Sequence, residues 1–229
     1  MEVIILCAGR GTRMAPLTDT VPKPMLSVLD KNLIEWKLHS LPEGVNHIIL
    51  IVGYLEEKVR NYFGSSWNGI PITYLKQEEL NGTGGAVLLA KDAVNKKALI
   101  LMGDDIYEPS DLKKLSEYDF ALLVFDEGGE GLKRKGQIIE ENGLLVGINE
   151  GTFQSDKKSS LINTGACVIS KNYFSYPPVK FSETEYGLPH TLVSISNDIP
   201  VKVLPASSWI QITTPECITK AEKILTTSK

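Results

Sequence analysis

The sequence contains little cysteine, no long apolar run and no excess of basic charge. Its three cysteines among 229 residues, Cys7, Cys167 and Cys217, are odd in number and far apart, which argues against a disulfide framework and for reduced thiols. It has no run of 18 apolar residues and no basic leader at its start, so we expect a cytoplasmic protein without a signal peptide or membrane span. The formal net charge of −4 gives no global attraction to nucleic acid or membranes, so a polyphosphate ligand would need a local cationic site.

Motifs of several other protein classes are missing as well. The chain has no Gly-Lys-Ser or Gly-Lys-Thr run, so it lacks a Walker phosphate loop. The dinucleotide-binding pattern fails because Met14 stands where its third glycine is required, which disfavours an NAD-dependent oxidoreductase. The histidines lie in no motif, and we expect all three to be surface or structural residues: His39, His47 and His190.

Apolar runs alternate with helical patterns along the first half of the chain. Short, continuously apolar segments predict strands over residues 2–6, 47–52, 72–75 and 98–102, and amphipathic spacing predicts helices over 33–41, 54–63 and 84–91. Strands that are apolar on both sides are typical of a mainly parallel sheet with helices on both faces. We therefore predict an α/β fold built on a mainly parallel central sheet.

The pattern changes after residue 125. Two short segments, 136–140 and 144–148, flank Asn142-Gly143, a dipeptide typical of a tight β-hairpin. Further on, the sequence predicts a polar loop over 151–160, a strand over 161–169, a helix over 186–196, an edge strand over 201–204 and a final helix that begins at Pro215. No linker separates the two parts, so we expect a single domain, 1–229, made of two halves, about 1–105 and about 106–229.

A glycine-rich loop follows the first predicted strand. Gly9 and Gly11 allow the backbone to approach a phosphate closely, and successive backbone N–H groups there can form a nest for an anion. Arg13 and Lys23 add positive charge, and Lys23 stands between two prolines on a stiff segment. The combination predicts a phosphate-binding loop.

A glutamine and a group of glycines come after the predicted strand at 72–75. The side-chain amide of Gln77 presents both a donor and an acceptor, so it can pair with the edge of a uracil-like base. Glycines from Gly82 onward allow the backbone to pack against a planar ring. These features predict a base-binding segment.

Two carboxylates follow the predicted strand at 98–102. Asp104 and Asp105 come directly after Gly103, at the carboxyl end of a strand, where α/β sheets bind their ligands. Carboxylate oxygens suit Mg²⁺ that bridges phosphate groups. The sequence therefore predicts a magnesium site at this strand end.

The glycine loop and its surroundings resemble a known family signature. The pattern that carries the resemblance is Gly9-x-Gly11-Thr12-Arg13-x-x-Pro16-Leu17-Thr18, followed by Pro22-Lys23-Pro24. It is similar to the signature of the sugar-nucleotide pyrophosphorylases, which include glucose-1-phosphate thymidylyl- and uridylyltransferases and N-acetylglucosamine-1-phosphate uridylyltransferases. The resemblance runs through nearly the whole chain. It implies a GT-A-like, Rossmann-type nucleotidyltransferase fold with a smaller β-hairpin region for the acceptor.

The same resemblance implies an activity and roles for the motif residues. The expected enzyme couples a sugar 1-phosphate to UTP or dTTP, uses Mg²⁺ as cofactor and releases pyrophosphate. Its first half would bind the nucleotide and its second half the sugar phosphate. Arg13 would hold the triphosphate, Lys23 would contact the α-phosphate and Asp104 would bind the metal. The remaining nucleotide-binding positions implied by the family are Leu6, Ala8, Gly9, Gly11, Thr12, Gln77, Gly82 and Thr83.

The second half matches the family less evenly. By resemblance to the N-acetylglucosamine-1-phosphate uridylyltransferases, hydroxyl or acetamido groups of the sugar would be bound by Gly136, Glu150 and Asn163. Thymidylyltransferase-like members carry Glu-Lys-Pro where this chain has Glu150-Gly151-Thr152, so a phosphate-contacting lysine is missing. Candidate replacements in the polar loop are Lys157 and Lys158.

The last informative position is Gln211. Many relatives carry an aspartate here as the second metal ligand, so the resemblance makes Gln211 the counterpart of that ligand. An amide oxygen can coordinate Mg²⁺ but brings no negative charge, so we expect weak metal binding before the triphosphate arrives. Two alternatives stay open: a cytidylyl- or guanylyltransferase for another phosphorylated acceptor, and a catalytically impaired nucleotide-binding regulatory relative. Because the chain ends soon after this segment, we expect a monomer or weak homodimer.

Overall fold

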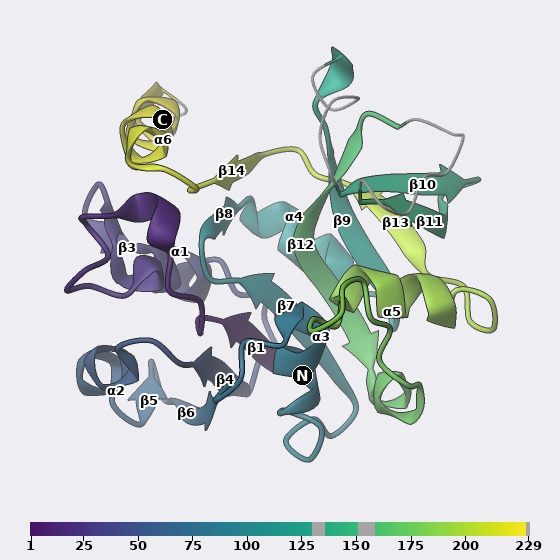
Figure 1. Cartoon of the computed structure of the whole chain (residues 1–229), viewed down its shortest axis with the longest axis horizontal. Helices are drawn as coiled ribbons and strands as arrows, with labels where there is room; N and C mark the ends of the chain where they lie inside the picture. Colours follow the sequence, from purple (N-terminus) through teal and green to yellow (C-terminus); the bar gives the residue numbers. More distant parts are fainter. Residues whose placement is uncertain (130–135, 151–158, 228–229) are drawn as a thin grey trace.

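The computed structural model describes residues 1–129, 136–150 and 159–227. Within these ranges ten strands form one sheet in the order β10-β11-β13-β9-β12-β7-β1-β4-β6-β5 (Figure 1). Helices cover both faces of this sheet, and the predicted α/β class is confirmed. None of the helices in these ranges has the length and apolarity needed to cross a membrane.

The first half of the chain forms the parallel part of the sheet, as predicted. The strands β1 (Glu2–Leu6), β4 (His47–Val52), β6 (Ile70–Lys76) and β7 (Lys97–Met102) pair in parallel in the order β7-β1-β4-β6. The short β5 (Ser66–Trp67) adds an antiparallel edge. Side chains of β1 point to alternate faces, and Val3, Ile4 and Ile5 are all fully buried. Burial on both faces explains why these strands are apolar throughout.

Helices pack on the two faces of the sheet. The face that carries Val3 and Ile5 is covered by α1 (Leu33–His39), α2 (Glu56–Phe63) and α4 (Pro109–Ser116). The opposite face, with Ile4, is covered by α3 (Gly82–Leu88) and α5 (Leu188–Ile195). The sequence analysis did not identify α4, although Pro109 at its first turn is a usual start signal for a helix.

The second half continues the same sheet with mixed pairing. The long strand β12 (Leu161–Ser170) runs antiparallel to both β7 and β9 (Ala121–Asp126), and β10 (Gln137–Glu141) and β11 (Leu144–Asn149) form the predicted hairpin. At the hairpin turn Asn142 and Gly143 have φ values of 54° and 74°, and two successive positive values are typical of a type I′ turn. A tight turn makes the hairpin strands antiparallel, and β12 adds antiparallel pairs with β7 and β9, so parallel pairing dominates only the first half.

One strand was predicted at the wrong place in the sheet. β13 (Lys202–Pro205) lies between β9 and β11 and is not an edge strand. Its short length and its exposed Lys202 are typical of an edge strand. Its two partners, however, come from parts of the chain far from it in sequence, and local spacing carries no information on such pairing.

Two small ladders outside the main sheet were not predicted. β2 (Ser27–Val28) pairs with β3 (Lys31–Asn32), and α6 (Pro215–Thr227), which begins at the predicted proline, packs against β2. β8 (Asp105–Tyr107) pairs antiparallel with β14 (Trp209–Gln211). Figure 1 shows β14 on the connection between the sheet and α6. The second ladder brings a late segment of the chain back to the end of β7.

Candidate functional site

The predicted nucleotide-binding residues gather at the carboxyl ends of the parallel strands. The glycine loop follows β1, Gln77 follows β6, and Asp104 follows β7. These segments enclose a cavity of about 320 Å³, which we call the first cavity. Ten predicted residues line it: Leu6, Ala8, Gly9, Gly11, Arg13, Lys23, Gln77, Gly82, Thr83 and Asp104. Thr12 is not among its lining residues, and it begins the short 3₁₀ helix Thr12–Met14.

Gly11 brings the glycine loop against Lys23. It has a φ of 65°, a left-handed conformation that strains other residues, and a Cβ there would lie 2.8 Å from the Cβ of Lys23. The hydroxyl of Thr18 donates to the carbonyl of Gly11 at 3.0 Å and closes the loop. Glycine at this position therefore allows the close approach of loop and lysine.

Lys23 and Asp104 form an ion pair in the first cavity. The Nζ atom of Lys23 lies 2.5 Å from Oδ2 of Asp104, and Lys23 is only 8% exposed. The carboxylate predicted to hold a metal is thus bonded to the ammonium predicted to contact a phosphate. Each charge compensates the other, and the ammonium of Lys23 would compete with a metal for this oxygen of Asp104.

A buried lysine that the sequence analysis missed lies next to this pair. Lys37 on α1 is 1% exposed, and its Nζ donates to the carbonyls of Leu33 and Gly103 at 2.9 and 3.0 Å. Burial lowers the pKa of Lys37 to about 8, and the negative charge of Asp105 opposes this shift. The contact with Gly103 joins α1 to the loop that presents Asp104. Because it spans 66 positions in sequence, no local pattern reveals it.

Asp105 is more deeply buried than its place beside Asp104 suggested. It is 1% exposed, and its Oδ2 lies 3.3 Å from the hydroxyl of Tyr107. Burial, and then the charge of Asp104, raise the pKa of Asp105, while the ammonium of Lys37 opposes them. The same Tyr107 hydroxyl donates to the carbonyl of Thr164 at 3.0 Å, so this network ties β8 to β12.

The ladder of β8 and β14 brings the two predicted metal ligands to one place. It aligns Gln211 with Asp105, and the N–H of Ile212 donates to the carbonyl of Asp104 at 3.0 Å. In the described ranges, no group of three or more His, Cys, Asp or Glu side chains is arranged to hold a metal. The donors offered are a few carboxylate and amide oxygens. This set fits Mg²⁺, which prefers oxygen ligands and usually keeps several water or phosphate oxygens of its own.

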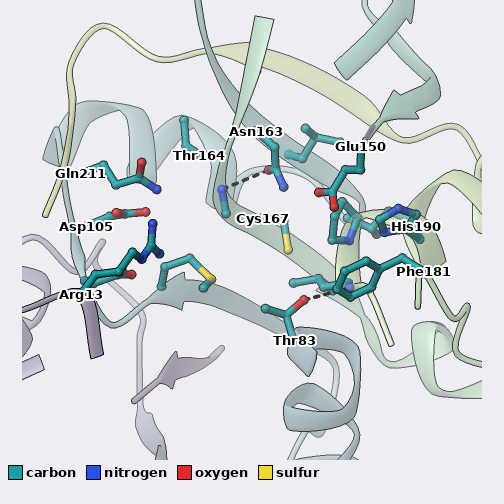
Figure 2. Close-up of a pocket in the computed structure, with 18 residues that line it drawn as sticks. Arg13, Thr83, Asp105, Glu150, Asn163, Thr164, Cys167, Phe181, His190 and Gln211 are labelled. Atoms are coloured by element: carbon teal, nitrogen blue, oxygen red, sulfur yellow. Dashed lines mark hydrogen bonds between the residues drawn. The ribbon is translucent and has the colours of Figure 1, made fainter. Parts of the chain in front are cut away.

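A second cavity, of about 310 Å³, is lined by residues of β12 and α5 (Figure 2). Glu150 and Asn163, two of the predicted sugar ligands, line it. Oδ1 of Asn163 accepts from the N–H of Gly165 at 3.0 Å, which leaves the Nδ2 group to donate to a ligand. Gly136 does not line the cavity, but its carbonyl accepts from the N–H of Asn163 at 2.9 Å. Outside the described residues lie Gly151, Thr152 and both candidate replacement lysines, Lys157 and Lys158.

One end of the second cavity is aromatic and apolar. Figure 2 shows Phe181 and His190 at this end and Arg13, Asp105 and Gln211 at the other. The Phe181 and His190 rings are stacked, with centroids 5.2 Å apart and planes inclined by 14°. Burial lowers the pKa of His190, which favours the neutral form of its ring. The sequence analysis assigned no site role to either residue, because each lies outside the recognised motifs.

The two cavities adjoin. Arg13, Thr83 and Asp104 line both of them, together with Met102. Oγ1 of Thr83 accepts from the N–H of Leu188 at 3.0 Å, which ties α3 to α5 at this boundary. A cation and a carboxylate thus lie where ligands in the two cavities would meet.

Known proteins resemble this chain in sequence. A family model described as nucleotidyl transferase matches residues 2–119. The chain is 33% identical to a bifunctional GlmU protein of Methanocaldococcus jannaschii, over 98% of this chain and 54% of that protein. It is also 33% identical to the D-glycero-alpha-D-manno-heptose 1-phosphate guanylyltransferase of Campylobacter jejuni, over 76% of this chain and 78% of that protein. The chain therefore spans about half the length of the GlmU relative.

Solved structures share the fold. A UDP-glucose pyrophosphorylase complexed with UDP-glucose superposes with a TM-score of 0.83 at 21% identity, over all of this chain and 99% of that chain. The inositol-1-phosphate CTP transferase from T. maritima gives a TM-score of 0.76 at 24% identity, over 97% and 96% of the two chains. At these identities the likeness shows the fold alone, and it confirms the Rossmann-type nucleotidyltransferase fold expected from the sequence.

Proposed function

Because the chain belongs to the nucleotidyl transferase family, among its sugar-nucleotide pyrophosphorylases, we propose that it couples a nucleoside triphosphate to a sugar 1-phosphate and releases pyrophosphate. The observation that carries this proposal is the pair of adjoining cavities with Arg13 and Asp104 at their boundary. The glycine loop and Gln77 make the first cavity suitable for a nucleotide. Glu150 and Asn163 make the second suitable for a sugar. The acceptor phosphate and the α-phosphate would meet at the boundary.

The proposed reaction requires compensation of charge and needs no general base. A sugar 1-phosphate is largely dianionic near neutral pH, since its second pKa is about 6 by analogy with phosphoserine. Its phosphate oxygen is therefore already a nucleophile. The protein has to overcome repulsion between two polyanions and align in-line attack on the α-phosphorus. Lys23 and Arg13 would supply positive charge, with Lys23 acting on the α-phosphate as negative charge develops there.

We propose Mg²⁺ as the cofactor, with Asp104 and Gln211 as its protein ligands. Both side chains offer oxygen donors of the kind that Mg²⁺ prefers, and the ladder of β8 and β14 supports their placement at one end of the second cavity. When bound, the ion would neutralise charge on the phosphate groups. Asp104 is the only one of the two ligands with a full negative charge. The protein alone would therefore bind the ion weakly, and the triphosphate would bring further oxygen ligands.

We propose UTP or dTTP as the nucleotide, with GTP as the second candidate. Gln77 in the first cavity supports a base with a matching hydrogen-bond edge. The observation that favours GTP is the 33% identity to a guanylyltransferase, which covers 78% of that protein. The structural likeness to a CTP transferase extends to the fold and gives no reason to expect CTP.

The test is pyrophosphate release with a panel of UTP, dTTP, GTP, CTP and ATP against several sugar 1-phosphates. We expect release only when triphosphate and acceptor are both present, and a loss of roughly 10²-fold or more in Asp104→Asn, the scale of losing one transition-state contact. The competing possibility is the catalytically impaired relative. Silence of the wild type with every pair, together with activity gained in Gln211→Asp, would establish that alternative.

A further inference from the structure

The side-chain nitrogen of Gln77 is already hydrogen-bonded within the protein. Its Nε2 group donates to Oδ1 of Asn81 at 3.0 Å and to the carbonyl of Gly82 at 3.2 Å. A backbone carbonyl can only accept a hydrogen bond, so the Gly82 contact fixes which end of the amide is the nitrogen. Both N–H groups of Gln77 are therefore used inside the protein.

The oxygen of the same amide is the atom left for a ligand. Gln77 is 8% exposed and lines the first cavity, and its backbone N–H donates to the carbonyl of Val52 at 2.8 Å. Among the hydrogen bonds of the described part of the chain, none ends on Oε1 of Gln77. The sequence analysis gave this amide both a donor and an acceptor for the base. The structure presents an acceptor alone.

Asn81 is held firmly enough to impose this orientation. Its backbone carbonyl accepts from the N–H of Tyr186, and its backbone N–H donates to the carbonyl of Glu79, both at 2.8 Å. Its side chain fills the space next to Gly85, where any Cβ would collide with Oδ1. Asn81 also stands at the N-cap of α3, yet its side chain makes no capping bond there. Its oxygen accepts from Gln77 where an N-cap asparagine would ordinarily accept from the helix backbone.

We propose that Asn81 is a positioning residue that presents Gln77 as a pure hydrogen-bond acceptor and thereby selects bases with a ring N–H on their pairing edge. Uracil and thymine carry this group at N3, and guanine carries it at N1. Cytosine and adenine have a lone pair at the corresponding ring nitrogen, which would face the lone pairs of Oε1. The inference rests on the proposed function, since it refines the base specificity of the same site.

The exocyclic amino groups of cytosine and adenine do not readily replace the ring N–H as the donor to Oε1 of Gln77. To bring its exocyclic amine to Oε1, either base would have to slide along the cavity wall. The backbone there is closely packed, because a Cβ on Gly82, which lines the first cavity, would collide with the backbone carbonyl of Tyr186. A site built to bond one polar group discriminates strongly against a base that leaves that group unpaired.

The experiment compares the affinities of UTP, GTP, CTP and ATP by titration calorimetry on the full chain, without a sugar phosphate. We expect the wild type to bind UTP and GTP at least roughly 100-fold more tightly than CTP and ATP. Asn81→Asp keeps an acceptor for Nε2 and should keep this ratio. Asn81→Leu has a similar size but no acceptor, and it should lower the ratio about tenfold, the order expected for one lost hydrogen bond.

A second variant tests the same point without changing either amide. Gly85→Ala places a methyl group against Oδ1 of Asn81, so it should displace that side chain and lower the ratio as Asn81→Leu does. Melting temperatures of all variants establish that each one is folded. Equal affinities in the wild type, or an unchanged ratio in both Asn81→Leu and Gly85→Ala, would overturn the inference. Selective binding without pyrophosphate release would leave the inference standing and count against the proposed function alone.

Discussion

The ammonium of Lys23 and the carboxylate of Asp104 lie 2.5 Å apart, one on the segment after the glycine loop and the other at the end of β7. A metal at Asp104 and a phosphate at Lys23 would each compete with this bond. The arrangement therefore couples the two ligands. A metal bound at the carboxylate would weaken its bond to the ammonium, and a phosphate bound at the ammonium would weaken its bond to the carboxylate.

Removing Lys23 should strengthen metal binding and lower turnover. In Lys23→Ala we expect Mn²⁺ alone to bind several-fold more tightly, because the carboxylate of Asp104 loses its competitor. Turnover should fall by roughly 10²-fold or more, because the α-phosphate loses a charged contact in the transition state. Electron paramagnetic resonance of free Mn²⁺ measures the first effect and pyrophosphate release the second. Weaker Mn²⁺ binding in the variant would mean that Lys23 supports Asp104 and does not compete for it.

Introducing a negative charge at position 211 should strengthen the proposed metal site. Gln211→Asp adds a second full negative charge beside Asp104, so Mn²⁺ should bind to the protein alone at least about tenfold more tightly, with activity equal or higher. Gln211→Glu is the matched control, since it carries the same charge on a side chain of the original length. Unchanged Mn²⁺ affinity in both variants would remove Gln211 from the metal site.

The stability of the protein should rise with pH as Lys37 loses its proton. Burial lowers the pKa of Lys37 from 10.5 to about 8, so between these values the unfolded chain binds a proton that the folded protein does not. Stability rises with pH wherever the unfolded state binds more protons. The destabilising effect of the buried ammonium is therefore fully present below pH 8 and disappears as the pH rises towards 10.5. The whole shift corresponds to about 3 kcal/mol.

Urea unfolding of the wild type and of Lys37→Met from pH 7 to pH 10.5 isolates this contribution. The free energy of unfolding should rise with pH in the wild type more than in the variant. Across this range the difference between the two should change by about 1–3 kcal/mol in favour of the wild type. A difference between the two proteins that does not change with pH would contradict the assignment to Lys37.

The aromatic end of the second cavity should control binding of the acceptor. Phe181→Ala removes the less buried partner of the stacked pair with His190, and we expect the KM for the sugar 1-phosphate to rise about tenfold, equivalent to 1.4 kcal/mol. The KM for the triphosphate should stay the same, since Phe181 does not line the first cavity. Phe181→Tyr keeps the ring and serves as the control. Equal changes in both KM values would indicate a general loss of structure.

The sequence predicted the parts of the fold and site that depend on local pattern. The strands around β1 are recognisable because burial on both faces requires continuous apolar runs. The glycine loop is recognisable because the close approach of Gly11 and Lys23 requires glycine at that position. The hairpin at Asn142-Gly143 is recognisable because few residues adopt successive positive φ values. Each of these features is determined by residues that are neighbours in the sequence.

The features that were missed depend on contacts between distant segments. The position of β13 inside the sheet and the contact of Lys37 with Gly103 leave no local signal. Neither does the stacking of Phe181 on His190, two residues outside any recognised motif. The orientation of the Gln77 amide follows from where Asn81 and the Gly82 carbonyl lie in three dimensions. Residue type alone therefore predicts a polar contact at Gln77, and the spatial arrangement determines how its amide is oriented.

The most direct test of the proposed activity is to identify the product by ³¹P nuclear magnetic resonance. The purified chain is incubated with Mg²⁺, a triphosphate that it binds and a sugar 1-phosphate. We predict the pair of coupled resonances of a new sugar–nucleotide diphosphate linkage, together with an equal amount of pyrophosphate, and neither signal when one substrate is left out. Conversion of the triphosphate to monophosphate or diphosphate without any diphosphate linkage to the sugar would contradict the account.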